Sequence, residues 1–174
     1  MKNILLISGS LRAKSINTAL LRTFAEELAD QATVAWADIN LPLFNEDIEA
    51  DFPASAEALR QQILDADAIV IASPEYNRAM TGGLKNALDW GSRPYGKNAW
   101  AGKRTLVVSA SPGGVAGALG MYQVKQTLLH LDAEVLGKPE FMVGGAYEKF
   151  NEAGELTDEK TRERVQAAVA TLLA

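Results

Sequence analysis

The stretch SGSLRAKSIN, residues 8–17, is rich in hydrogen-bond donors and directly follows the apolar run at residues 4–7. Four of its side chains can donate to a ligand: Ser10, Arg12, Ser15 and Asn17. A capped turn is the alternative interpretation, but it explains only Ser15, as the residue before a helix. Several donors and one cation beside a helix N-terminus favour a bound phosphate, so the sequence predicts an anion site here.

Two common nucleotide-binding loops do not match this stretch. From Gly9 to Lys14 it is one residue shorter than a P-loop, and Ala13 stands where the P-loop has its second glycine. The dinucleotide fingerprint GxGxxG is absent as well, because Leu11 and Arg12 follow where glycine would be needed. The donor set therefore suits a terminal monophosphate better than a triphosphate or a pyrophosphate.

A second stretch of unusual composition is SPEYNRAMTGG, residues 73–83. Pro74 cannot continue a strand ladder, so the chain must turn sharply there. The turn would present Tyr76 and main-chain amides to a crevice, although a tyrosine that only packs is the alternative. A flat aromatic cofactor needs such a wall.

The third stretch is SASPGGVAG, residues 109–117. Glycine backbone can approach a ligand closely, which would give Ser111, Gly113 and Gly114 a binding role. A plain turn that leads into a helix is the alternative interpretation.

These loops follow segments that have the pattern of buried strands. Apolar runs of strand length alternate with helical periods, which is typical of βαβ units around a parallel sheet. The predicted strands are Asn3–Ser8, Thr33–Ala37, Ala68–Ser73, Thr105–Ala110 and Phe141–Gly144. The predicted helices are Ser15–Leu28, Pro53–Asp65, Thr81–Trp90, Gly117–Leu131 and Thr157–Leu173. We therefore expect one α/β domain, residues 1–174, with a doubly wound five-stranded parallel sheet and helices on both faces.

Ligands of such folds bind beyond the carboxyl ends of the strands, where the three loops lie in this prediction. The covering helices need an apolar face. In the first helix we expect a stripe of Ile16, Leu20, Phe24 and Leu28, and in the second we expect Leu59, Ile63 and Leu64 to point inward. Thr157 is the expected N-cap of the last helix.

Composition narrows the function further. The chain has no cysteine, so disulfides, thiolate metal sites and thiol nucleophiles are excluded, and any redox chemistry needs a bound cofactor. A net charge of −5 without a basic run argues against nucleic acid. No signal-peptide core or apolar span of membrane length is visible, so we expect a cytoplasmic protein without a membrane partner.

GSLRAKSIN and SPEYNRAMTGGLKNALDW together resemble the NADPH-dependent FMN reductase family, flavodoxin-like proteins that include bacterial quinone and chromate reductases. The resemblance implies the strand order 2-1-3-4-5. It also implies that Ser10, Arg12, Ser15 and Asn17 hold the FMN phosphate. The flavin ring would lie against the second and third loops, and the residues implied there are Pro74, Glu75, Tyr76, Asn77, Ser111, Gly113 and Gly114.

The same resemblance implies an NAD(P)H-dependent oxidoreductase. FMN would accept hydride at N5 from NADPH or NADH and reduce a quinone, azo dye, free flavin or metal oxyanion such as chromate in a ping-pong cycle. The flavin then carries the chemistry, so no catalytic side chain is expected. Arg78 is a possible contact for NADPH, and a homodimer or homotetramer is expected, with Lys85, Asn86 and Asp89 fixing a loop or the partner subunit.

Two other readings stay open. A flavodoxin-type electron carrier, or a flavin-binding module without activity, would also hold FMN, although Arg12 in the phosphate loop favours the enzyme.

His130 has no partner at a spacing typical of catalysis, so we expect a packing or surface role. The acidic stretch at residues 38–51 lacks the spacing of a metal loop, and we expect a solvated segment with no metal site.

Overall fold

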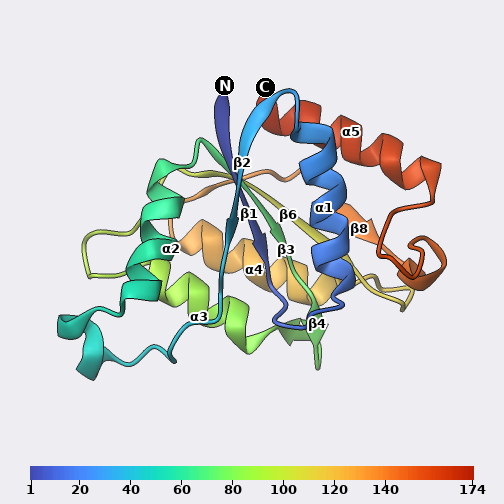
Figure 1. Cartoon of the computed structure of the whole chain (residues 1–174). Coiled ribbons are helices and arrows are strands. Elements are labelled where there is room, and N and C mark those ends of the chain that lie inside the picture. The colour runs from blue at the N-terminus through green and yellow to red at the C-terminus, as the bar shows by residue number, and fades with distance from the viewer.

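A parallel sheet forms the centre of the computed structural model, which describes residues 1–174 (Figure 1). Its strands are β1 (Lys2–Ser8), β2 (Ala32–Ala37), β3 (Ala68–Ala72), β6 (Arg104–Ala110), β7 (Glu134–Val135) and β8 (Phe141–Val143). The order is β2-β1-β3-β6, and β7 and β8 both pair with β6 in parallel. The predicted α/β fold and the order 2-1-3-4-5 are confirmed, with the fifth position divided between β7 and β8.

The division of the fifth strand has a local cause. Pro139 lies between β7 and β8 and has no N–H to donate to the ladder. Only the second part, β8, shows the continuous apolar pattern of a buried strand, and the sequence analysis missed the short β7.

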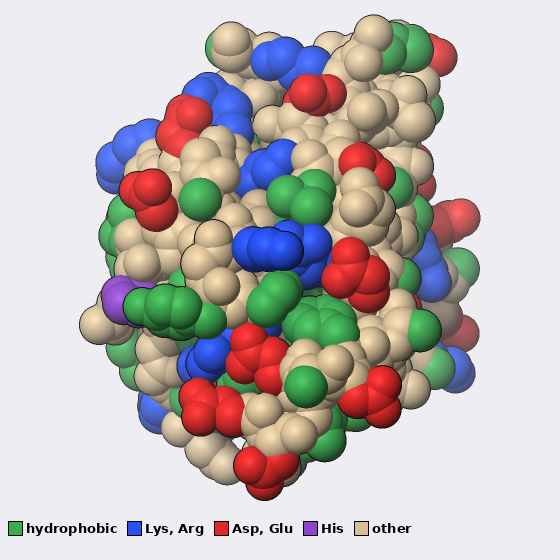
Figure 2. All heavy atoms as spheres, turned by 90° about the vertical axis from the view of Figure 1, so that its left-hand side faces the viewer, with side chains coloured by type: hydrophobic (Ala, Val, Ile, Leu, Met, Phe, Trp, Pro, Cys, Tyr) green, Lys and Arg blue, Asp and Glu red, His purple; other side chains and the backbone are tan.

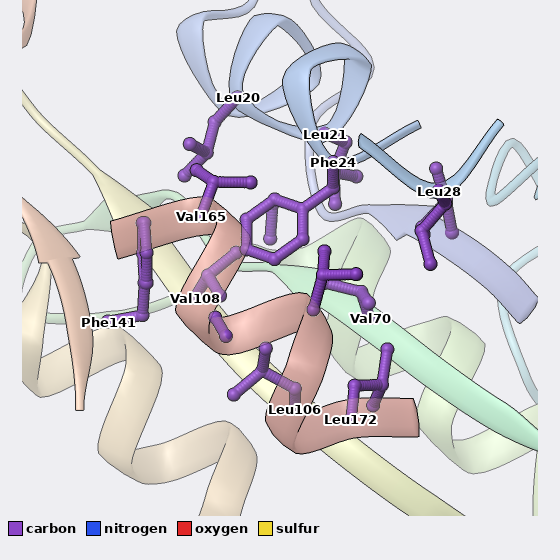
Figure 3. Close-up of a cluster of buried hydrophobic side chains, with 14 of the residues drawn as sticks. Leu20, Leu21, Phe24, Leu28, Val70, Leu106, Val108, Phe141, Val165 and Leu172 are labelled. Carbon is purple, nitrogen blue, oxygen red and sulfur yellow. The ribbon is translucent and has the colours of Figure 1, made fainter. Parts of the chain in front are cut away.

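Five α-helices cover the sheet. They are α1 (Ile16–Leu28), α2 (Ala54–Asp65), α3 (Gly82–Gly91), α4 (Ala118–His130) and α5 (Glu159–Leu173). One core lies between the sheet and the pair α1 and α5, and a second core lies between the opposite face and α2, α3 and α4. In Figure 3, Phe24 of α1 and Val165 of α5 point toward each other above β3 and β6. The fully buried strands are apolar without alternation because both faces are covered.

Some expected details of the helices are wrong. Asp158, not Thr157, caps α5, because the Asp158 carboxylate accepts the N–H of Thr161 at 2.9 Å. Thr157 instead donates its hydroxyl to the carbonyl of Lys149. Leu64 does not point inward, since 40% of it is exposed, and the inward face of α2 is formed by Ala56, Leu59 and Ile63. In α1 the stripe of Leu20, Phe24 and Leu28 is fully buried, whereas Ile16 is only partly buried.

Three short elements lie outside the main pattern. A hairpin of β4 (Glu75–Tyr76) and β5 (Ala79–Met80) follows β3, and 3-10 turns span Glu46–Asp51 (η1) and Ala146–Glu148 (η2). The two chain ends lie together at the edge of the sheet away from this hairpin (Figure 1). None of the helices has the length and apolar character that crossing a bilayer requires.

Candidate functional site

The three predicted loops meet at the carboxyl edge of the sheet and enclose a cavity, here called the loop cavity. Eight of the predicted site residues line it: Ser10, Arg12, Ser15, Asn17, Pro74, Glu75, Tyr76 and Ser111. The other lining residues are Ile16, Ala110, Pro112 and Tyr147. Because β1, β3 and β6 are neighbours in the sheet, the loops that leave their carboxyl ends must converge.

The first loop keeps its donors available to a ligand. Ser15 is the N-cap of α1, and its Oγ accepts the N–H of Thr18 at 3.3 Å, which leaves its O–H without a partner in the protein. The guanidinium of Arg12 is exposed and forms neither a hydrogen bond nor an ion pair. The first N–H groups of α1 have no acceptor within the helix either. One cation, one hydroxyl and a helix N-terminus thus face the loop cavity.

Asn17 lines the same cavity but is already engaged. Its Nδ2 donates to the carbonyl of Ala110, and its Oδ1 accepts the N–H of Ala110, both at 2.9 Å. This pair of bonds is buried and joins the first turn of α1 to the end of β6. Asn17 therefore fixes the distance between the first and third loops and has at most one amide hydrogen left for a ligand.

The second loop is a tight hairpin. Asn77 and Arg78 have φ angles of 51° and 67°, and they connect the paired residues Tyr76 and Ala79. Two consecutive positive φ angles in a two-residue connection define a type I′ turn, which matches the twist of the flanking strands. The turn raises Tyr76 to the surface, with 56% of it exposed.

Glu75 ties this hairpin to α4. Its Oε2 accepts the N–H of Gly120 at 3.0 Å, and its Oε1 lies 3.8 Å from the Nη1 of Arg78. A Cβ at Gly120 would lie 3.1 Å from the carbonyl oxygens of both Pro74 and Ala79, so the helix can approach the hairpin only without a side chain there. The second loop is therefore held rigidly by protein contacts.

The third loop has glycines that protein packing does not require. A Cβ at Gly114 would meet nothing within 4 Å, and one at Gly113 would meet only the Ser111 Oγ at 3.8 Å. Neither has a positive φ. The N–H of Gly114 donates to no group of the protein, whereas that of Gly113 donates to the Ser111 Oγ. The loop thus offers a free amide and open space for another molecule.

Gly9 fixes the first loop against the second. A Cβ there would lie 2.8 Å from the Cδ of Pro74 and 3.0 Å from the carbonyl oxygen of Ala72. The hydroxyl of Thr81, the N-cap of α3, donates to the carbonyl of Gly9 at 2.6 Å. The tight packing of Gly9 is a protein requirement, unlike the open packing of Gly114.

Arg12 and Tyr76 also line a second, smaller hollow on the side of α3, together with Gly9, Leu11, Thr81, Gly82 and Gly83. The side chains of Arg12 and Tyr76 therefore separate two concave surfaces. One of them suits an anion, and the other is bordered by apolar groups and glycine backbone.

Not every predicted residue joins the loop cavity. Asn77, Arg78, Gly113 and Gly114 lie outside its lining, on the neighbouring turns. Tyr147, in contrast, lines the cavity and was missed, because it lies after β8, far along the chain from the three loops. The one signal in the sequence was that Tyr147 is an aromatic residue just beyond a predicted strand, at the edge of the sheet where the three loops lie.

Other singled-out residues have structural partners. Asn86 holds the loop before η1, since it accepts the N–H of Phe44 at 2.8 Å and donates to the carbonyl of Pro42 at 2.9 Å. Lys85 and Asp89 form an ion pair with each other. In the acidic stretch, Glu46 and Glu49 pair with Arg93, so this segment is partly anchored and not merely solvated. His130 is exposed at the end of α4 farthest from the hairpin.

On the face shown in Figure 2, acidic and basic side chains are mixed over the upper part, and acidic side chains predominate over the lower central part. The clearest pKa shifts lie outside the loop cavity. A hydrogen bond between Tyr122 and Glu140 raises the pKa of the phenol and lowers that of the carboxyl group. Burial lowers the pKa of the neighbouring Lys125.

Comparison with known proteins finds related chains. The family model described as NADPH-dependent FMN reductase matches residues 2–148. A quinone reductase from Pseudomonas putida is 42% identical over 169 residues, which cover 96% of this chain and 90% of the relative. A 2-hydroxy-1,4-benzoquinone reductase from a Burkholderia species is 37% identical, and the match covers 94% of this chain and 90% of the relative.

A solved structure is similar over the whole chain. The flavoenzyme NAD(P)H:(acceptor) oxidoreductase FerB from Paracoccus denitrificans superposes with a TM-score of 0.92 at 35% identity, over 99% of this chain and 96% of that one. An FMN-dependent NADH-azoreductase from Bacillus anthracis, solved with FMN, shares the fold with a TM-score of 0.69 at 14% identity over the full length of both chains.

Proposed function

This chain belongs to the NADPH-dependent FMN reductase family, and we propose that it is an NAD(P)H-dependent quinone reductase that binds FMN where the three loops meet. The observation that carries the proposal is the set of unused donors in the loop cavity. Arg12, the Ser15 hydroxyl and the N-terminus of α1 face the same space. Glu75 is the one carboxylate in the lining, and it contacts Arg78 and the N–H of Gly120 instead of Arg12.

The residues present fit FMN. A terminal phosphate carries close to two negative charges and needs cationic and N–H donors, which the first loop supplies. The ring system needs a flat wall and a free amide, which Tyr76 and the N–H of Gly114 can supply. Ser10 is placed to orient the loop, since its Oγ accepts the N–H of Arg12 at 3.2 Å.

When bound, FMN would supply the redox chemistry, which is hydride transfer from NADPH or NADH to the second substrate in a ping-pong cycle. The protein binds and orients both substrates. Asn17 and Glu75 keep the three loops at fixed spacing through their contacts with Ala110 and Gly120. Tyr76 is exposed and the space beside Gly114 is open, so the proposed flavin site would have one accessible face that the two substrates use in turn.

Arg78 is our candidate contact for the nicotinamide dinucleotide. Its side chain is 68% exposed at the tip of the hairpin, and its pairing with Glu75 is long at 3.8 Å. The guanidinium can therefore turn toward a phosphate at little cost.

Quinones are the acceptors we expect first, because relatives with 37–42% identity carry quinone reductase names. Azo dyes, free flavin and chromate are further acceptors to test. We also propose a homodimer or homotetramer and a cytoplasmic location, where NAD(P)H is available to the enzyme. Size-exclusion chromatography with light scattering and cell fractionation test these two points.

The deciding experiment is an anaerobic absorbance titration. FMN is added to purified protein, the excess is removed, and the oxidised-flavin band is followed while NADPH, or separately NADH, is added. Bleaching with recovery on addition of a benzoquinone supports the reductase and ranks the two donors. Bound flavin that neither nucleotide reduces indicates a carrier or a binding module. Absence of bound flavin overturns the assignment of the loop cavity.

A further inference from the structure

A second cavity, here called the α1 cavity, lies beside the phosphate loop. Residues of α1 and of the preceding loop form one wall, and the segment 147–154 after β8 forms the other. Its volume is about 250 Å³, close to the lower end of the roughly 300–1,000 Å³ of ligand pockets. It therefore has room for a fragment of a ligand and not for a whole dinucleotide.

The α1 cavity shares a rim with the loop cavity. Ser15, Ile16 and Tyr147 line both of them. A group attached to a phosphate at Ser15 can thus continue over this rim into the α1 cavity without leaving the protein surface.

Two cations without partners face the α1 cavity. Lys14 and Arg22 line it, and neither forms an ion pair. The guanidinium of Arg22 lies over Gly154, with its Nη1 3.8 Å from where a Cβ would be. Glu152 is the one carboxylate in the lining, so the lining carries a net positive charge that suits a phosphate.

The remaining lining is aromatic and apolar. Tyr147 is 64% exposed between the two cavities, and Phe150, Ile16 and Ala19 form an apolar floor. An exposed ring in a lining that also holds apolar groups and cations suits a purine base that carries a phosphate.

We propose that the α1 cavity binds the adenosine-phosphate half of a dinucleotide, with the adenine against Tyr147 and the phosphate near Lys14 and Arg22. This inference rests on the proposed flavin-phosphate site at Ser15. The half-molecule belongs either to FAD, in which it extends from the flavin phosphate, or to NAD(P)H, in which it extends from the nicotinamide end. The shared chemistry is that of adenosine phosphate.

The direct test uses 5′-AMP as the probe on FMN-loaded protein, with binding measured by calorimetry or by ligand-observed NMR. We expect the variant Lys14→Ala/Arg22→Ala to bind AMP roughly tenfold or more weakly, because two charge-assisted contacts are lost. FMN affinity should stay unchanged in this variant. Lys97→Ala, an exposed lysine in the loop that precedes β6, is the matched control and should bind AMP as the wild type does.

Two further titrations distinguish the sources. In the first, FAD and FMN are titrated into flavin-free protein; if the Lys14→Ala/Arg22→Ala variant binds FAD more weakly than the wild type does but binds FMN equally well, the source is FAD. In the second, NADP⁺ is titrated into FMN-loaded protein; if the variant binds it more weakly than the wild type does, the source is the nicotinamide dinucleotide. Wild-type protein that binds FMN but not AMP, or a variant that binds AMP, FAD and NADP⁺ as well as the wild type does, overturns this inference alone. Protein that binds no FMN overturns the proposed function instead.

Discussion

The side-chain amide of Asn17 and the backbone of Ala110 form a closed pair of hydrogen bonds, 2.9 Å in each direction, between the start of α1 and the end of β6. Both residues are buried, so the two bonds are shielded from bulk water. The pair sets the spacing of two of the three loops that form the candidate flavin site.

Asn17→Ala should therefore destabilise the fold and loosen the site together. Leaving the buried N–H and carbonyl of Ala110 without partners costs roughly 2–4 kcal/mol in the free energy of unfolding. Urea denaturation measures this loss, and a flavin titration at low urea should show weaker FMN binding. Asn40→Ala, an exposed asparagine whose side chain has no partner, serves as the control and should change stability by less than about 0.5 kcal/mol.

The phosphate assignment predicts a loss of flavin affinity in Arg12→Ala/Ser15→Ala. Each charge-assisted hydrogen bond to a phosphate contributes roughly 1.5–3 kcal/mol, so the dissociation constant of FMN should rise at least tenfold. Fluorescence quenching of FMN measures it. Ser15 also caps α1, so the variant should lose about 1 kcal/mol of stability while it stays folded. Unchanged FMN affinity contradicts the assignment.

Gly9 and Gly114 should respond to alanine in opposite ways. Gly9→Ala forces a Cβ to 2.8 Å from Pro74, so overpacking should cost roughly 1–3 kcal/mol in the free energy of unfolding. Gly114→Ala meets no protein atom and should leave stability unchanged or slightly higher, by up to about 1 kcal/mol. Its FMN affinity should fall nevertheless, because in the proposed flavin site the added methyl group would occupy space beside the ring. Thermal unfolding with and without FMN separates the two effects.

The hairpin tip predicts a trade between stability and substrate binding at Arg78. Its φ of 67° is unfavourable for any residue with a Cβ. Arg78→Gly relieves this strain but makes the unfolded chain more flexible, so the net gain in the free energy of unfolding should be roughly 0.5–1 kcal/mol. If Arg78 contacts the dinucleotide, the same variant should raise the KM for NADPH several-fold. Arg78→Lys keeps a positive charge and the backbone strain, and it should show a smaller rise in KM without the gain in stability. An unchanged KM in Arg78→Gly would rule out the contact.

Asp158 predicts a pH-dependent contribution from the cap of α5. Hydrogen bonds from the hydroxyl and the N–H of Thr161 hold the pKa of this carboxyl group below its usual value of 3.8. A depressed pKa in the folded state means that the stabilisation is complete above pH 3.8 and is lost as the pH falls through the lower, folded-state value. Asp158→Ala should thus lower Tm at pH 7, and the difference from wild type should shrink as the pH falls below 3.8. Thr157→Ala is the comparison, because Thr157 does not cap the helix.

Much of the fold follows from local patterns. The buried strands β1, β3 and β6 are continuous apolar runs, and their ends differ from the predicted ones by a single residue at most. The residues Ser15 and Thr81 mark the starts of α1 and α3 because their hydroxyls replace missing backbone acceptors. Short elements escaped prediction, since the hairpin turn is Asn-Arg and not the usual Asn-Gly, and since Pro139 divides the fifth strand.

By itself the sequence determined the alternation of strands and helices, the three unusual loops and the residues in them, because each is written in consecutive positions. It also determined the family, through two motifs that lie more than fifty residues apart. Tertiary structure alone decided which donors remain free. It engages Asn17 with Ala110, leaves Arg12 and the Ser15 hydroxyl without partners, and brings Tyr147 from the far end of the chain to the rim of two cavities. The physical reason is that hydrogen-bond partners and cavity walls come from segments that only the packed sheet brings together.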